Sequence, residues 1–231
     1  ERVKDYWATD LPINRGLYNF DKIEYQYYRD DGVALEAFKG GEYYLRREYD
    51  VKKWQTGYND IGRTVTKEDI THQRPEWLKS LIFNTRRPLF QDRRVRQALS
   101  LMFDYKWMNK VFYYDTLKPI DSIFPNSELR ASGAAEGEEL DVLKKNFNDL
   151  APEVLTQAWR PSILDMRQKQ KQALALFKES GWTVKNGKLV DAKGNLFNFE
   201  ILLGESADEK IALQFARSLK KIGIEARVRT V

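Results

Sequence analysis

The sequence predicts a mixed α/β fold, with a mixed sheet flanked by helices, in a single domain spanning residues 1–231. Segments with alternating apolar residues, typical of strands, are interspersed with segments whose apolar residues recur at helical spacing. A chain of 231 residues can bury roughly 70% of its unfolded surface in one core. The sequence contains no cysteine, so this core is expected to form without disulfides.

The N-terminal part of the chain predicts a strand, a helix and a second strand. Residues 22–28 alternate between polar and apolar side chains, as in a half-buried strand. A helix is expected to open at Asp31 and to end at Gly40-Gly41, where glycine allows the left-handed backbone of a C-cap. Residues 43–49 follow as a second strand, and this order predicts a βαβ unit with a right-handed crossover.

The middle of the chain predicts a strand, two helical segments and a long loop. Residues 78–84 hold a short apolar run that indicates a strand. From residue 95 to residue 103 the apolar residues recur at i, i+3, i+4, i+7 and i+8, which predicts a helix after Asp92. A second helical segment continues to residue 112, and residues 116–137 are expected to form a loop because they hold prolines and glycine.

Helices and a hairpin are expected next. The helices are predicted over residues 138–147, 152–159 and 166–180. The pair Asn186-Gly187 then supplies the two positive φ angles of a type I′ hairpin turn.

The chain is expected to close with a strand, a helix and a final strand. The strands are predicted over residues 197–203 and 224–231. Between them, Ser206 and Glu209 have the spacing of a capping box, which predicts that the helix opens there.

Composition excludes several classes of function. His72 is the single histidine, and there is no cysteine, no calcium-binding loop and no glycine-rich phosphate loop, so we expect no metal and no cofactor. No nucleophile motif accompanies His72, so we expect no enzyme. The net charge of +5 permits an anionic partner without requiring one. No apolar run approaches the roughly 20 residues of a membrane span, so no direct membrane insertion is expected.

Three ordered segments of the chain resemble the family 5 extracellular solute-binding proteins, the oligopeptide and dipeptide receptors of ABC importers. They are Tyr6-Trp7 with the helix of residues 33–42, the stretch 83–99 with its Pro-containing turn and arginine-rich helix, and residues 173–182 followed by 219–225. Residues 18–21 and 126–129 are similar to a branch associated with the uptake of peptides and of peptide-like antibiotics of the microcin C type.

The resemblance implies one lobe of a class II periplasmic-binding-protein-like fold. The chain begins at Glu1 without an initiator Met and is expected to be an excised fragment, most of the second lobe, with the first lobe and C-terminal part absent. The implied function is substrate capture for import of peptides, by closure of two lobes over the ligand. The implied protein is a periplasmic monomer whose partners are a peptide or peptide-like ligand and the membrane subunits of the importer, with no nucleic acid.

Seven residues are candidates for contact with the ligand. Peptide receptors hold extended ligands through main-chain hydrogen bonds, so the predicted strand end at Asn84, Thr85 and Arg86 is a candidate wall of the cleft. The alternative is that Asn84 and Thr85 only satisfy the turn before Pro88.

The remaining candidates are Phe124, Asn126, Trp54 and Tyr58. Phe124 and Asn126 lie in the long loop, since such loops often carry function, although a structural crossing loop is the alternative. Trp54 and Tyr58 could offer aromatic faces to a ligand, and core packing is the alternative for both.

A second hypothesis concerns the arginine-rich helix over residues 93–104. Guanidinium groups bind phosphate bidentately, so Arg93, Arg94 and Arg96 could bind nucleic acid or another anionic surface. The alternative is a solvated or ion-paired helix face, because these arginines flank the apolar stripe.

Overall fold

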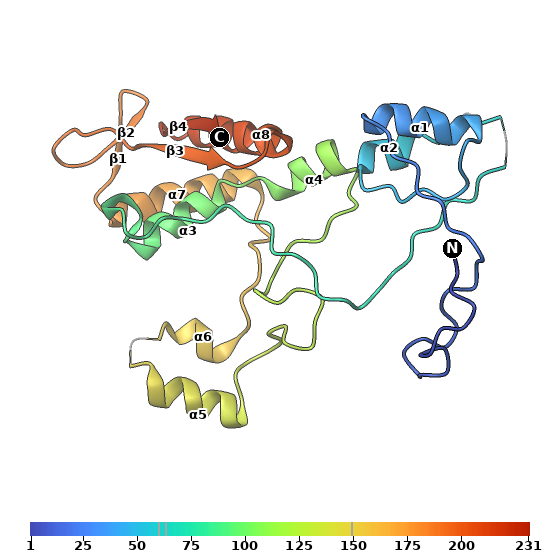
Figure 1. Ribbon diagram of the computed structural model, residues 1–231. Coiled ribbons are helices and arrows are strands. Elements are labelled where there is room, and N and C mark those ends of the chain that lie inside the picture. The colour runs from blue at the N-terminus through green and yellow to red at the C-terminus, as the bar shows by residue number, and fades with distance from the viewer. Residues whose placement is uncertain (60, 63, 149) are drawn as a thin grey trace. The chain divides into compact units, whose positions relative to one another are not determined.

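The computed structural model describes residues 1–59, 61–62, 64–148 and 150–231, and the chain divides into two compact units, Glu1–Lys67 and Glu68–Val231 (Figure 1). Each unit is described by itself. The expectation of a single domain over residues 1–231 stays a prediction.

The N-terminal unit contains two short helices, each capped by an aspartate. Helix α1 (Asp31–Gly40) begins where Asp30 Oδ1 accepts hydrogen bonds from the amides of Gly32 and Val33, and it ends at Gly41 with φ of 84°. The predicted helix and its glycine stop are therefore confirmed. Helix α2 (Val51–Thr56) follows, with Asp50 accepting from the amide of Lys53.

The two strands predicted around α1 were wrong. Neither residues 22–28 nor residues 43–49 form a strand, and no strand occurs among the described residues of this unit, so the βαβ prediction was wrong as well. A strand needs a neighbouring main chain to complete its hydrogen bonds, and the described residues supply none here. The alternating aromatic side chains consequently remain in solvent, with Tyr27 92% exposed.

The C-terminal unit begins with a strand prediction that was also wrong, because residues 78–84 have no strand partner. The helices that follow confirm those predicted from the helical spacing of apolar residues. In chain order they are η1 (Pro88–Phe90), α3 (Arg93–Leu101), α4 (Tyr105–Tyr113), α5 (Gly137–Asn146), α6 (Pro152–Thr156) and α7 (Met166–Glu179). Helix α6 ends three residues before the predicted end at Trp159.

The last part of this unit holds all four strands of the described chain. Strands β1 (Thr183–Lys185) and β2 (Lys188–Val190) are antiparallel and joined by the predicted Asn-Gly turn. Strands β3 (Asn198–Leu203) and β4 (Glu225–Thr230) are parallel, with Asn198 opposite Glu225 and Leu203 opposite Thr230. Figure 1 shows helix α8 (Glu209–Lys220), which connects them, beside β3 and β4.

The predicted capping box at the start of α8 was wrong. Residues Ser206–Asp208 form a single 3-10 turn, η2, and the residue before the helix, Asp208, makes no side-chain cap. Asp208 instead pairs with Lys79, whose Nζ lies 2.6 Å from its Oδ1. A tertiary ion pair therefore holds the carboxylate that precedes the helix.

One apolar core joins α3, α7, α8 and the strands. Helix α3 packs on α7, and α8 packs on β4. Phe197 is in the centre, with its ring 5.3 Å from Phe177 and 4.7 Å from Trp182. Gly223 ends the connection after α8 with φ of 82°, and a Cβ there would lie 2.6 Å from the amide nitrogen of Leu189, so only glycine fits.

Candidate functional site

The seven candidate residues lie in three places. Trp54 and Tyr58 belong to the N-terminal unit, whereas residues 84–86 and the pair Phe124 and Asn126 belong to separate segments of the C-terminal unit.

Arg46 is the centre of a polar cluster in the N-terminal unit. Its side chain is only 7% exposed, and its guanidinium lies 2.6 Å from Asp31 Oδ1 and 3.2 Å from Glu48 Oε2. It also donates to the hydroxyls of Tyr43 at 3.1 Å and Tyr58 at 3.0 Å. The buried cation is thus surrounded by hydrogen-bond acceptors from α1 and from the coil on either side of α2.

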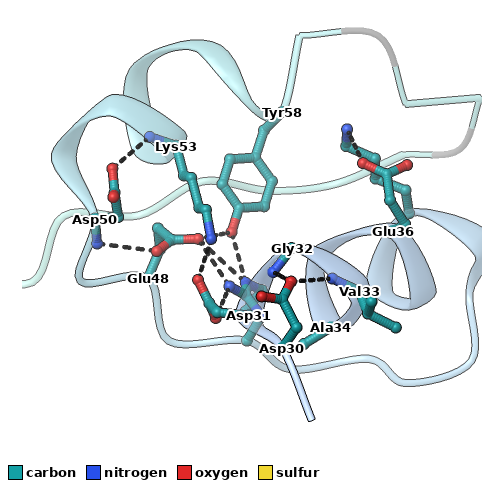
Figure 2. Close-up of polar contacts among 12 residues, drawn as sticks. Asp30, Asp31, Gly32, Val33, Ala34, Glu36, Glu48, Asp50, Lys53 and Tyr58 are labelled. Carbon is teal, nitrogen blue, oxygen red and sulfur yellow. Dashed lines mark hydrogen bonds and ion pairs between the residues drawn. The ribbon is translucent and has the colours of Figure 1, made fainter. Parts of the chain in front are cut away.

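Figure 2 shows that the side chains of Glu48, Asp31, Lys53 and Tyr58 point toward one another. Glu48 is 4% exposed and accepts from the Tyr58 hydroxyl at 2.7 Å. Lys53 of α2 contacts Asp31 of α1. We call Asp31, Tyr43, Arg46, Glu48, Lys53 and Tyr58 the Arg46 cluster. The cluster links α1 to α2 and the residues that flank it.

The contacts of the cluster shift the pKa values of Arg46, Tyr58 and Asp31. Burial disfavours the charge of Arg46, yet its hydrogen bonds to Tyr43, Asp31, Tyr58 and Glu48 outweigh burial and raise its pKa. Burial, with the hydrogen bond to Glu48, raises the pKa of Tyr58 to about 12. Hydrogen bonds from Lys53 and then Arg46 lower the pKa of Asp31. At neutral pH the Tyr58 phenol is therefore protonated, and the ion pairs of Asp31 with Arg46 and Lys53 are charged.

Trp54 and Tyr58 contact each other and their own chain. Their ring centroids are 6.3 Å apart, and the ring of Tyr58 lies 6.0 Å from that of Phe38. Lys67 Nζ lies 4.6 Å from the centroid of Trp54, within cation–π range. These are contacts of packing, which the sequence left as the alternative, and a ligand role for the two residues stays a prediction.

Asn84 closes the turn before Pro88. Its Oδ1 accepts from the amide of Arg86 at 3.2 Å and from Arg86 Nε at 3.4 Å, and its carbonyl accepts from the amide of Arg87 at 3.0 Å. The turn role that the sequence offered as an alternative is therefore present. Thr85 is exposed beside it.

The segment before this turn keeps its main chain unpaired. No hydrogen bond between described residues involves a main-chain group of residues 78–83. The segment is nevertheless held at both ends, by the Lys79–Asp208 ion pair and by Phe83, whose ring lies 5.6 Å from that of Phe90. A tethered segment with free N–H and C=O groups offers the donors and acceptors that an extended peptide requires.

One depression opens beside this segment, and a second opens beside the turn that follows it. One, of about 370 Å³, is lined by residues 82–86, including the candidates Asn84, Thr85 and Arg86. The other, of about 590 Å³, is lined by Arg87, Pro88 and Leu89 together with the first residues of β3 and β4. The consecutive residues Arg86 and Arg87 thus line one depression each.

The long loop is anchored through Asn126. With φ of 53°, Asn126 donates from Nδ2 to the carbonyls of His72 at 3.0 Å and Arg74 at 2.7 Å. The carbonyl of Pro125 accepts from the amide of Glu76. Asn126 therefore positions the loop, while Phe124 remains 54% exposed. Contact of either residue with a ligand stays a prediction.

Two of the three arginines of helix α3 are hydrogen-bonded within the fold, and the third, Arg93, is half exposed and lies 4.0 Å from Glu153. Arg94 donates to Asp92 and to the carbonyl of Glu179, and Arg96 donates to the carbonyls of Phe90 and Gln91. Guanidinium groups held in this way are not free to bind phosphate, so the structure favours the ion-paired helix face over a nucleic-acid surface.

The described residues contain neither a metal-binding cluster nor a helix able to cross a membrane. No group of three or more His, Asp and Glu side chains there could hold a metal ion. None of the helices there is both long and apolar enough to cross a bilayer.

Sequence reasoning missed two parts of this picture. No sequence motif marks Arg46 and Glu48, because the partners of Arg46 lie between residues 31 and 58 at no regular spacing. The contribution of Phe199, Glu200 and Arg227 to the second depression was also missed, because they meet residues 87–89 only after folding. No local signal could have identified either set.

Comparisons with known proteins agree with this fold. The family model for bacterial extracellular solute-binding proteins, family 5 Middle, matches residues 1–231. The uncharacterized protein YejA of Escherichia coli K12 is 40% identical over 238 residues, which cover 100% of this chain and 39% of that protein. A probable peptide-binding protein YejA of Agrobacterium fabrum is 34% identical over 242 residues, with 100% and 39% covered. The chain thus spans about two fifths of the length of these relatives.

Solved structures give the same result at lower identity. The oligopeptide-binding protein AppA of Bacillus subtilis, in complex with a nonapeptide, matches with a TM-score of 0.51 and 20% identity, over 87% of this chain and 34% of that one. An ABC transporter substrate-binding protein of Sinorhizobium meliloti matches with a TM-score of 0.54 and 17% identity, over 93% and 40%. These matches confirm the expected fold class, a part of a class II periplasmic-binding-protein fold.

Proposed function

The chain belongs to the family 5 bacterial extracellular solute-binding proteins, and from this we propose that it forms part of a receptor that captures peptides for import by an ABC transporter. The match of the family model over residues 1–231 is the observation that carries the proposal. The name of the Agrobacterium fabrum relative, a probable peptide-binding protein, supports peptides as the solute. The proposed location is the periplasm, and the proposed partners are the membrane subunits of the importer.

The geometry of the C-terminal unit supports peptide binding through the main chain. An extended ligand could pair with the free N–H and C=O groups of residues 78–83, because such pairing does not depend on the ligand's side chains. The two depressions would receive side chains of the ligand. In this role Asn84, Thr85 and Arg86 border the bound peptide.

The proposed mechanism is closure of the receptor over its ligand. A peptide that contacts this chain and the rest of the receptor only in the closed state shifts the equilibrium toward closure, by its difference in affinity for the two states. No bond is made or broken, so a monomer without cofactor or catalytic residue suffices for this function.

The first experiment tests binding on the full-length receptor that contains this chain. Native mass spectrometry should detect peptides that co-purify, and a peptide pool should raise the melting temperature. At 100 times the dissociation constant the ligand adds about 2.7 kcal/mol to stability. A receptor that co-purifies with no peptide and is not stabilised by any pool would contradict the proposal.

A matched pair of variants tests the main-chain site. Ile82→Pro removes one N–H from the unpaired segment, whereas Ile82→Ala removes the side chain and keeps that N–H. Ile82 is exposed and its amide has no partner among the described residues, so both variants should fold. We expect Ile82→Pro to weaken peptide binding more than Ile82→Ala. Equal affinities for the two variants would place the ligand elsewhere.

A further inference from the structure

We propose that Arg86 and Arg87 make the site selective for peptides that present a free carboxylate beside the turn at residues 84–88. This inference rests on the proposed function, because it names the chemistry of the ligand at the same site.

The side chain of Arg86 has hydrogen-bond donors without a partner among the described residues. It lines the first depression and donates only from Nε, to Asn84 Oδ1, so its two terminal nitrogens have no partner among the described residues. Asn84 Oδ1 also accepts a hydrogen bond from the main-chain amide of Arg86. The main chain and the side chain of Arg86 are therefore both bound to the side-chain oxygen of Asn84. Arg86 thus lines the depression while its guanidinium forms no ion pair with a described residue.

Arg87 has no ion-pair partner among the described residues, although two carboxylates line the same depression. It lines the second depression with Arg227, Glu200 and Glu225. Glu200 is already paired with Arg229 at 3.0 Å, and its pKa is lowered by Arg229 first, and then by Arg227 and Arg87. Glu200 therefore interacts with several arginines at once, and Arg87 forms no ion pair with a described residue.

The chemistry of arginine selects a carboxylate. Its planar guanidinium offers parallel N–H donors that match the two oxygens of a carboxylate. Ile82 lines the first depression and Leu89 and Phe199 line the second, so apolar groups of the ligand have a surface beside the charge. A peptide whose main chain pairs with residues 78–83 would reach the turn with either its C-terminal carboxylate or an acidic side chain.

The test compares three pentapeptide pools, made without Asp or Glu, on the full-length receptor. One pool has free C-terminal carboxylates, the second is C-terminally amidated, and the third is amidated and carries one Glu. We expect the wild type to bind the first or third pool about tenfold more tightly than the second, and the pool preferred identifies the source of the carboxylate.

Substitutions locate the selectivity. Arg86→Gln combined with Arg87→Gln should reduce the preference to about twofold, whereas Arg93→Gln on α3 should leave it unchanged. The double Lys variant should keep part of the preference, because the charge remains and the bidentate geometry does not. Titration by isothermal calorimetry measures the affinities, and circular dichroism establishes that the variants fold.

The outcomes separate this inference from the proposed function. A wild type that binds all three pools equally, or a Gln variant that keeps the full preference, would overturn the inference and leave peptide capture intact. A wild type that binds none of the pools would overturn the proposed function and the inference together.

Discussion

The two units of the chain are stabilised in different ways. In the described part of residues 1–67 the buried apolar residues are Ala8, Leu35, Ala37 and Phe38, and the buried charges of Arg46 and Glu48 lie among hydrogen-bond partners. The C-terminal unit has one continuous apolar core built on α3, α7, α8 and β3. The first unit therefore depends on a network of charges, and the second depends on packing.

Two cations with buried side chains, one in each unit, illustrate this difference between a charge network and apolar packing. Arg46 has hydrogen bonds to four side chains, two of them carboxylates. Lys169 on α7 is 8% exposed, and its side-chain amine has no hydrogen bond or ion pair with a described residue. Burial of a charge is tolerated at low cost only where partners replace water, so removal of these two cations should change stability in opposite directions.

The largest effect is expected from a cavity in the core of the C-terminal unit. Phe177→Ala removes a fully buried ring that packs on Phe197. We expect a loss of about 3–5 kcal/mol in the free energy of unfolding, measured by urea denaturation. Leu202→Ala, on the exposed face of β3, should cost far less. Similar losses for the two variants would mean that this core does not dominate stability.

The next effect tests the network of the N-terminal unit. Arg46→Met leaves Glu48 buried without its cation and should cost about 3 kcal/mol. Hydrogen exchange at the amides of α1 and α2 would report the loss within this unit. The double variant Arg46→Met with Glu48→Met should be more stable than the single variant, because neither charge then remains. If the double variant is the less stable of the two, the network is not what holds this unit.

The third prediction is a gain of stability. Burial lowers the pKa of Lys169, an effect that Asp104 opposes and Lys106 reinforces. The folded state therefore disfavours the charged amine at neutral pH, and wild-type stability should rise as pH increases toward about 10, the ordinary lysine value. Lys169→Met should add about 1 kcal/mol at pH 7 and flatten this rise.

The control for this gain is Lys171→Met, an exposed position on the same helix. It should change thermal stability little and keep the pH dependence. A Lys169→Met variant that is less stable than the wild type at pH 7 would show that the amine has an attractive partner in solution.

The smallest effect is the acid sensitivity of the Arg46 cluster. Because Lys53 and Arg46 lower the pKa of Asp31 in the folded state, its contribution is complete above about pH 4 and is lost as pH falls through the folded pKa. Asp31 is largely exposed, so the contribution should stay below about 1 kcal/mol. Hydrogen exchange at the amides of α1, measured as the pH is lowered, checks this contribution. Asp31→Asn should remove the acid-sensitive part of the protection, whereas Asp10→Asn, at another exposed carboxyl, should leave it in place.

The same contrast explains which structural predictions succeeded. The helices over residues 31–40 and 166–180 and the Asn186-Gly187 turn were predicted correctly, because apolar periodicity and turn chemistry are local properties. Strands β3 and β4 were also predicted correctly, and each is the other's partner within this chain. Of the candidate site, the sequence indicated residues 84–86 at a turn, but not what surrounds them.

By itself, the sequence determined the family, the helices and hairpin, and the turn at Asn84, since these depend on residues close together in the chain. Only the tertiary structure decided that residues 22–28, 43–49 and 78–84 are not strands, that Asp208 binds Lys79 rather than capping α8, and that Arg46 is surrounded by partners. The physical reason is the same throughout. An alternating pattern or a charged side chain specifies what a residue can do, whereas the partner that satisfies it is supplied by segments distant in the sequence.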